Sequence, residues 1–306
     1  MARFSMPVPT REDMRRGIVF VIASVFVFAV VNAIVKWLVV RYPVAEIIFF
    51  RSSFALLPCS FLIATHGGLP VLRTRRLGEH VTRAALQFVS MMCIFTAFGL
   101  MPLADAVAIT FSSPLFLTVL SIPLLGEKVR IHRWSAVVVG FVGVLVMLPP
   151  GSGMLQGGAL FALINAVMNA SLTIAVRRMS LTEASTALVF YQTLTTAVIG
   201  LALLPFYWVA PSLADLALFA AAGLLSGTGQ YWWTQAYRFL PAAVAAPFSY
   251  TSMVWSLILG YAVWSDVPTA AVLIGAAIVV ASGLYILYRE TVRRAVKPAL
   301  AATGPH

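Results

Sequence analysis

Long apolar runs, separated by short polar or turn-forming segments, fill the chain from about residue 15 to about residue 288. A helix that rises 1.5 Å per residue needs about 20 apolar residues to cross about 30 Å of hydrocarbon. With charges, prolines and glycines taken as boundaries, the pattern predicts about ten membrane-spanning helices. Their expected ranges are 15–39, 44–65, 79–99, 103–124, 131–149, 155–177, 182–205, 213–236, 241–263 and 268–288. Because the runs are continuously apolar rather than alternating, they favour an all-α bundle over a barrel.

Composition supports a membrane protein. Hydrophobic residues make up 61% of the 306 residues and charged residues only 10%, whereas soluble domains carry about 25% charged residues. The first apolar run is too long for a signal-peptide core and has no small-residue cleavage site after it, so we expect it to remain as a helix.

Basic residues are distributed unevenly between the two sides of the predicted bundle. If the N-terminus is cytoplasmic, all but three of the 21 Lys and Arg residues fall on the cytoplasmic side. The exceptions are Lys36, Arg41 and Arg51, around the first outside connection. Cytoplasmic connections carry an excess of Lys and Arg. The distribution therefore predicts a multi-pass inner-membrane protein with both termini in the cytoplasm.

The two halves of the chain resemble each other at nearly constant offsets. At an offset of 139, Phe111 aligns with Tyr250 and Glu127 with Asp266; at 137, Asn32 aligns with Asn169. Five helices per half is an odd number, so the second half should enter the membrane from the opposite side, as in many transporters. We predict an arm at 1–14, five-helix inverted repeats at 15–149 and 155–288, and a basic cytoplasmic tail at 289–306, disordered after Pro298.

Several soluble functions are excluded by what the sequence lacks. The net charge of +11 comes from short clusters between apolar runs rather than a continuous basic face, which argues against nucleic-acid binding. Cys59 and Cys93 lie inside apolar runs, and no histidines stand at metal-ligand spacing. No phosphate-binding loop, nucleophile elbow or zinc-protease motif is present. We expect no cofactor, no metal site and no enzymatic activity.

Polar residues within the apolar runs are the candidates for a binding site, because a polar group in hydrocarbon is unfavourable unless it is paired or hydrated. Several recur on equivalent helices of the two halves and point to a shared cavity. The candidate substrate-binding residues are Asn32, Lys36, Gln87, Ser90, Asn165, Asn169, Gln230, Trp232, Trp233 and Tyr250. The alternative is that the polar groups join helices by hydrogen bonds and that the aromatic residues belong to interfacial belts.

Charged residues inside the spans are fewer. Arg51 lies about 10 Å deep in the second span and Asp105 lies near the outer surface, and both are candidates for gating or charge recognition. Arg51 and Lys36 could instead extend outward to the interface. None of the ten acidic residues falls in the middle of a predicted span. We therefore expect no coupling through a central carboxylate.

One stretch of the first half carries a family resemblance. The residues are Ser113-Pro114-Leu115-Phe116, Leu124-Leu125-Gly126-Glu127-Lys128, Gly140 and Gly143. They resemble the drug/metabolite transporter superfamily, and more narrowly its EamA-type ten-helix members. The second copy departs from the motif, with Met253 in place of Pro114 and Asp266 in place of Glu127.

Within that superfamily the chain is similar to the YddG-type exporters of aromatic and neutral amino acids. The resemblance implies a central cavity, a small-molecule substrate and outward movement of amino acids through the lipid membrane. Efflux of another solute, such as a nucleobase, polyamine or drug, remains an alternative, and a membrane-embedded enzyme is a weaker one. The pattern is compatible with a monomer or a homodimer.

Overall fold

The computed structural model describes residues 11–65, 68–126, 131–147, 153–180, 182–240 and 248–302, and within these ranges the chain is helical without strands. The elements are α1 (Arg11–Val39), α2 (Val44–Thr65), η1 (Leu69–Leu72), α3 (Leu77–Leu100), α4 (Leu103–Thr110), α5 (Ser113–Leu125), α6 (Ile131–Met147), α7 (Gly153–Met179), α8 (Ser185–Tyr207), α9 (Leu213–Phe239), α11 (Thr251–Trp264) and α12 (Ala270–Ala302).

These helices follow the predicted spans. In the described part of the chain, six stretches are long and apolar enough to cross a membrane, in α1, α2, α3, α4–α5, α7 and α8. Three shorter apolar helices lie in α6, α11 and α12, and α9 fills the expected eighth span with 27 residues. The expected fifth span reaches into residues 148–149 and the expected ninth span into 241–247, and both stretches lie outside the described residues. Residues 1–10 of the N-terminal arm and Glu127 lie outside them as well.

The fourth predicted span is two helices rather than one. Helix α4 ends at Thr110, and α5 begins at Ser113 after a two-residue turn. Pro114 has no backbone N–H to donate, and its ring conflicts with the carbonyl of Thr110, which favours a break in the helix at this point. Discontinuous helices at mid-membrane line the binding sites of many transporters.

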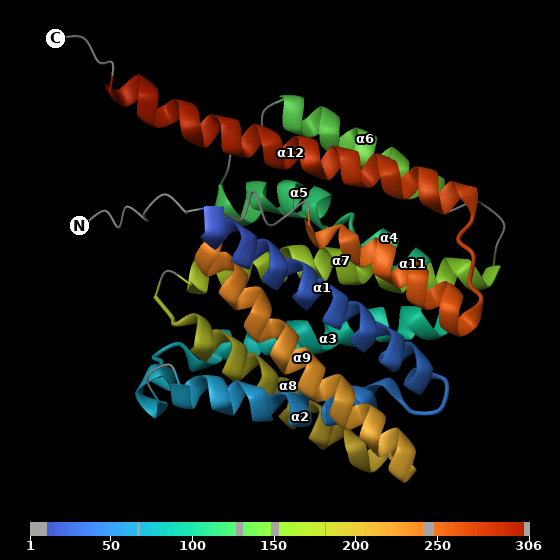
Figure 1. Ribbon diagram of the computed structural model, residues 1–306. Helices are drawn as coiled ribbons and strands as arrows, with labels where there is room; N and C mark the ends of the chain where they lie inside the picture. Colours follow the sequence, from blue (N-terminus) through green and yellow to red (C-terminus); the bar gives the residue numbers. More distant parts are fainter. Residues whose placement is uncertain are drawn as a thin grey trace.

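The last helix runs further than predicted. Helix α12 continues through Pro298 to Ala302, whereas the sequence analysis expected a tail from residue 289 that is disordered after Pro298. Residues 289–302 are rich in Ala and Arg, which have high helix propensity and can extend an existing helix. Figure 1 shows α12 projecting beyond the other helices.

The bundle has two ends that differ in which connections they hold. The beginning of α1 and the end of α12 lie at the same end, which we call the terminal end (Figure 1). The opposite, distal end holds the connections at 40–43, 101–102, 208–212 and 265–269. Because α1 starts at the terminal end and α7 starts at the distal end, the second half is inverted relative to the first.

The helices pack as the inverted repeat requires. Helix α2 packs against its counterpart α8, and α6 against its counterpart α12. The contact of α1 with α9 has its equivalent in the contact of α7 with α3. At the α6–α12 crossing, the backbones meet at Gly143 and Gly275, where a Cβ on Gly275 would lie 2.5 Å from the Gly143 carbonyl oxygen. The 139-residue offset relates Gly143 to Ser282 and Ala136 to Gly275. This equivalent contact also forms, because the Ser282 hydroxyl donates to the Ala136 carbonyl oxygen.

Large apolar side chains on the outside of the bundle complete this picture. Phe61, Leu145 and Phe206 are more than two-thirds exposed, as are Ile131 on α6 and Leu213 on α9. Soluble monomers rarely expose apolar surface so widely. The chain is therefore an all-α membrane protein of two repeats, with its outer surface suited to lipid.

Candidate functional site

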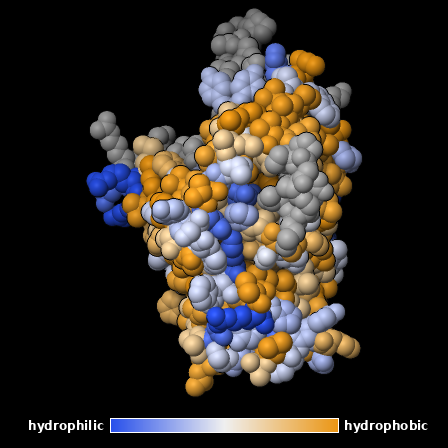
Figure 2. All heavy atoms as spheres, turned by 90° about the vertical axis from the view of Figure 1, so that its right-hand side faces the viewer, coloured by the Kyte–Doolittle hydropathy of each residue, from blue (hydrophilic) through white to orange (hydrophobic). Residues whose placement is uncertain are grey.

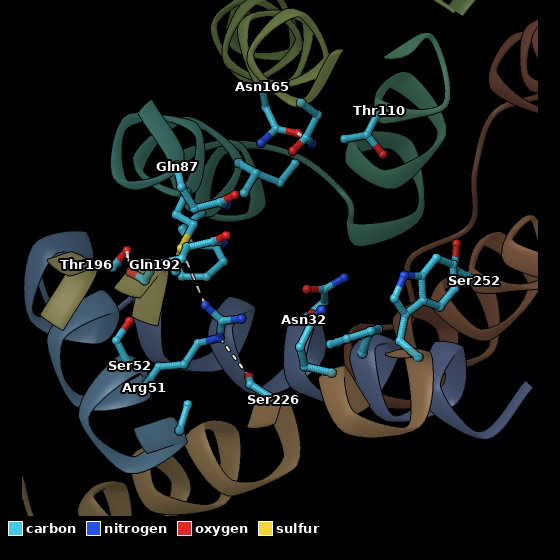
Figure 3. A pocket seen from close by; sticks show the side chains of 18 of the residues that line it. Asn32, Arg51, Ser52, Gln87, Thr110, Asn165, Gln192, Thr196, Ser226 and Ser252 are labelled. Atoms are coloured by element: carbon cyan, nitrogen blue, oxygen red, sulfur yellow. Dashed lines mark hydrogen bonds between the residues drawn. The ribbon is translucent and has the colours of Figure 1, made fainter. Parts of the chain in front are cut away.

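A cavity of about 600 Å³ lies between the two halves. Its lining comes from eight helices: α1, α2, α3, α4, α7, α8, α9 and α11. This volume is within the range of about 300–1,000 Å³ typical of small-molecule sites. Figure 3 shows polar side chains reaching into it from both halves, including Asn32, Gln87 and Asn165.

Arg51 is the charged residue among the described residues that line the cavity. Its Nε donates to Ser226 Oγ at 2.8 Å, and its Nη1 lies 3.6 Å from Met91 Sδ. The guanidinium carbon stands 5.7 Å from the centre of the Phe95 ring. The sequence analysis treated outward extension of Arg51 as an alternative, but Figure 3 shows the side chain directed into the cavity, because Ser226 and Met91 hold its nitrogens there.

Amide side chains form the opposite wall. Asn165 Nδ2 donates to the carbonyl oxygen and the hydroxyl of Ser90, at 2.9 and 2.8 Å, so it also joins α7 to α3. Asn169 Nδ2 donates in turn to Asn165 Oδ1 at 3.0 Å. The Asn165 amide is therefore held in one orientation, with Asn169 beside it on the cavity wall. Gln87 and Gln230 line the same space from α3 and α9.

The structure brings together part of the predicted site. The predicted residues that line the cavity are Asn32, Arg51, Gln87, Asn165, Asn169, Gln230 and Trp233. Ser90 is fully buried behind Asn165. Tyr250 stands at the start of α11, with its ring 5.0 Å from the repeat-related Phe111 and its hydroxyl against Gly283. Neither Tyr250 nor Trp232 is among the lining residues that the structure describes.

Lys36 and Asp105 lie at the distal end instead. Lys36 Nζ donates to Asp266 Oδ2 at 2.7 Å and to the Met101 carbonyl oxygen at 3.3 Å, and it stands 5.0 Å from the centre of the Trp264 ring. Asp105 is buried and close enough to interact electrostatically with Lys36 and Asp266. Lys36 is one turn beyond the cavity-lining Asn32, so the ion pair lies on the distal side of the cavity.

A second polar cluster joins α2 and α9 at the same end. Asp215 accepts from Tyr42 Oη at 2.8 Å, from Ser212 Oγ at 2.8 Å and from Arg41 Nη1 at 3.3 Å. Glu46, which is fully buried, accepts from the backbone N–H of Val209 at 3.1 Å. Figure 2 looks onto this end and shows hydrophilic residues gathered in a strip between hydrophobic flanks. Both clusters tie the first half of the chain to the second.

The sequence analysis missed one wall of the cavity. Gln192, Thr193 and Thr196 line it from α8, and Ser52 lines it from α2 (Figure 3). Gln192 and Thr196 are four residues apart and so share a helix face. The same spacing identified Asn165 and Asn169, so it could have identified this pair as well.

Comparison with known proteins finds one transporter family and several transporters of similar sequence. Two matches to the EamA-like transporter family cover residues 15–148 and 156–288. The S-adenosylmethionine uptake transporter of Rickettsia prowazekii (strain Madrid E) is 29% identical over 277 residues, which are 90% of this chain and 93% of that protein. The riboflavin transporter of Rhizobium johnstonii is 29% identical over 92% of this chain and 94% of its own length.

Another relative is named as an exporter, and one solved structure has a similar fold. The pseudopaline exporter CntI of Pseudomonas aeruginosa is 29% identical over 87% of this chain and 94% of its own length. A solved crystal structure shares the fold at a TM-score of 0.62 and 20% identity, covering 90% of this chain and 97% of the other. The relatives from Rickettsia, Rhizobium and Pseudomonas are named as transporters of small metabolites and not as enzymes. Two repeats around a polar cavity, each matched by the same family model, show that the chain belongs to the EamA-like transporter family and is a multi-pass membrane transporter of small metabolites.

Proposed function

We propose that this chain exports amino acids, chiefly aromatic and neutral ones, by alternating access around the central cavity. The observation that carries the proposal is a cavity between two inverted halves, lined by amide side chains and by Phe95, Phe98 and Trp233. Amide groups can pair with the amino and carboxylate groups of an amino acid. Apolar rings can cover its side chain.

The proposed membrane arrangement follows from charge. With both chain ends in the cytoplasm, the terminal end faces inward and the distal end, with its few basic residues, faces the outside of the inner membrane. Opening of the distal end then releases the solute outward. The surrounding lipid contacts the exposed apolar helix faces, and each chain holds a complete cavity of its own.

A second candidate is uptake of an amino-acid derivative. It is favoured by the similarity to the S-adenosylmethionine uptake transporter. S-adenosylmethionine carries the same α-amino carboxylate as an amino acid, so one set of cavity groups could serve either solute. The two candidates differ in the direction of movement and in the bulk of the rest of the solute.

Transport by the purified protein in liposomes tests the proposal. We expect uptake of labelled phenylalanine, tyrosine or leucine, with riboflavin and S-adenosylmethionine as competing probes. The variants N169A and Q87A should lower this uptake about 2- to 10-fold, because each removes a hydrogen bond worth about 0.5–1.5 kcal/mol. T228A is the control, since Thr228 is half-buried on α9 away from the cavity lining and donates to the Leu224 carbonyl oxygen of its own helix.

Movement of another probe without any amino acid would contradict amino-acid transport. Full activity in both amide variants would remove Asn169 and Gln87 from the binding site. An imposed pH gradient should leave the amino-acid flux unchanged, because no acidic residue is expected in mid-membrane. Uphill accumulation driven by that gradient would contradict this expectation.

A further inference from the structure

We propose that the Arg51 guanidinium binds the carboxylate of the transported solute, so that the cavity selects carboxylate-bearing solutes over their amide or decarboxylated analogues. The inference rests on the proposed role of the cavity as the transport site, and it deepens that role by naming the chemical class of the solute. It also gives one residue a specific task in recognition.

The partners of Arg51 are neutral in the part of the chain that the structure describes. Ser226 Oγ accepts from Nε, and Met91 Sδ is a weak acceptor 3.6 Å from Nη1. A guanidinium carries five N–H donors. Within the described residues, Nη2 has no hydrogen-bond partner and no carboxylate lies within ion-pair distance of the side chain. The group therefore retains donors directed at the cavity.

Other basic residues of the protein interior have stronger hydrogen-bond acceptors than Arg51 has. Lys36 is paired with Asp266, and Arg41 is paired with Asp215. Arg83 has no carboxylate either, but its two terminal nitrogens donate to the Leu188 carbonyl oxygen and to Gln192 Oε1, and Arg83 is not among the lining residues. A charge removed from water is unfavourable unless a counter-charge compensates it. At Arg51 a solute carboxylate could supply that counter-charge.

The rest of the described cavity lining around Arg51 is uncharged. The described lining contains no Asp or Glu that could compete for the guanidinium or attract a strongly cationic solute. Figure 3 shows Arg51, Gln87 and Asn32 reaching into the same space from three helices. A guanidinium can hold both oxygens of a carboxylate by two parallel hydrogen bonds. The amides are then left for the neighbouring polar groups of the solute.

Ser226 is a positioning residue in this arrangement. Its hydroxyl accepts from Arg51 Nε and donates to the Ala222 carbonyl oxygen at 2.6 Å, so it fixes the plane of the guanidinium from α9. The site thus spans the two halves of the chain: the charge comes from α2 and its orientation from α9. We expect S226A to weaken binding of a carboxylate several-fold while preserving the preference for it.

The test measures binding separately from transport. Purified wild-type protein is titrated with L-phenylalanine, L-phenylalaninamide and phenethylamine, and with methionine and methioninamide, and the ligand-induced rise in melting temperature gives the affinity. We expect each amino acid to bind at least 10-fold more tightly than its analogues. R51Q should weaken binding of the amino acids about 10- to 100-fold and abolish the preference, because it removes charge-assisted hydrogen bonds. R51K should restore part of the preference, since it keeps the charge without the planar fork.

The control is R41Q, which removes an arginine that is paired with Asp215 at the distal end, away from the cavity lining. It should lower the melting temperature of the ligand-free protein yet leave the preference for carboxylates intact. Equal affinity of the wild type for the acids and their analogues, no binding of any acid, or an unchanged preference in R51Q would each overturn the inference. If carboxylates bind selectively but no amino acid is transported, the proposed function fails and the inference stands. If amino acids and their amides are transported equally well, the proposed function stands and the inference fails.

Discussion

The two halves of the molecule share one frame but differ in the chemistry at equivalent positions. In the contact of α7 with α3, Asn165 donates two hydrogen bonds to Ser90. The equivalent positions in the contact of α1 with α9 are Phe28 and Gly229, where a Cβ on the glycine would lie 3.2 Å from the Phe28 ring. One crossing is held by hydrogen bonds and the other by close apolar packing. The frame is therefore symmetric, and the polarity of the cavity wall is not.

The two ends of the bundle also differ in the side chains at equivalent positions. Lys36 pairs with Asp266 at the distal end. In the second half, the position equivalent to Lys36 is Thr173, which hydrogen-bonds only within its own helix, to the Asn169 carbonyl oxygen. An uncharged threonine cannot form the ion pair at the terminal end. If the protein works by the proposed alternating access, each end of the bundle closes in turn, and the replacement of Lys36 by Thr173 in the second half makes the two closures unequal in strength.

The largest expected effect comes from breaking the close contact between Gly143 and Gly275 at the α6–α12 crossing. In G275L, the new side chain meets the Gly143 carbonyl oxygen and Met147 Cγ, both 2.5 Å from its Cβ. Backbone cannot move aside as a flexible side chain can, so we expect a loss of about 3 kcal/mol or more. Thermal unfolding in detergent measures it. G78A is the control, because a Cβ there has no atom within 4 Å; equal stability of the two variants would contradict the close approach.

A smaller effect is expected when the distal end is made like the terminal end. K36T leaves Asp266 without its partner and should weaken distal closure by about 2 kcal/mol, less than for a fully buried pair because both side chains are partly exposed. That corresponds to an increase of about 30-fold in the open population. The measurement is alkylation of a cysteine at Thr110, a cavity-lining position, after replacement of Cys59 and Cys93.

The reagent for this measurement is a membrane-impermeant maleimide added from the distal side. We expect faster alkylation in K36T and recovery toward the original rate in the charge-reversed variant K36D/D266K. If neither variant changes the rate, the ion pair does not hold the distal end closed.

The smallest predicted effect concerns the hydrogen-bonded crossing. A double-mutant cycle of N165A and S90A should give a coupling free energy between about 0.6 and about 1.7 kcal/mol, the average and the maximum measured for side-chain pairs within membranes. The same cycle at the apolar crossing, with F28A and G229A, should give a smaller value, since the second pair has no hydrogen bond to lose. Equal coupling free energies from the two cycles would contradict the difference between a hydrogen-bonded crossing and an apolar one.

How far the sequence predicts the site depends on whether a feature is local. Asn165 and Asn169 could be identified because they share a helix face and because Asn169 aligns with Asn32 at the 137-residue offset. The pairing of Lys36 with Asp266 could not, because 230 residues separate them and only packing of α1 against the α11–α12 connection brings them together. The depth of Arg51 followed from counting residues, but its direction depends on Ser226 from α9.

The apolar runs and the offset between the halves determined the helical class, the number of repeats and their inversion, because hydrocarbon requires every backbone group to be satisfied within its own helix. Tertiary structure alone decided which polar groups meet. It joined α2 to α9 around Arg51, paired Lys36 with Asp266 at the distal end and placed the break between α4 and α5 beside the cavity. The physical reason is that a side chain's partner is set by the helix packed against it, and that packing combines residues from distant parts of the chain.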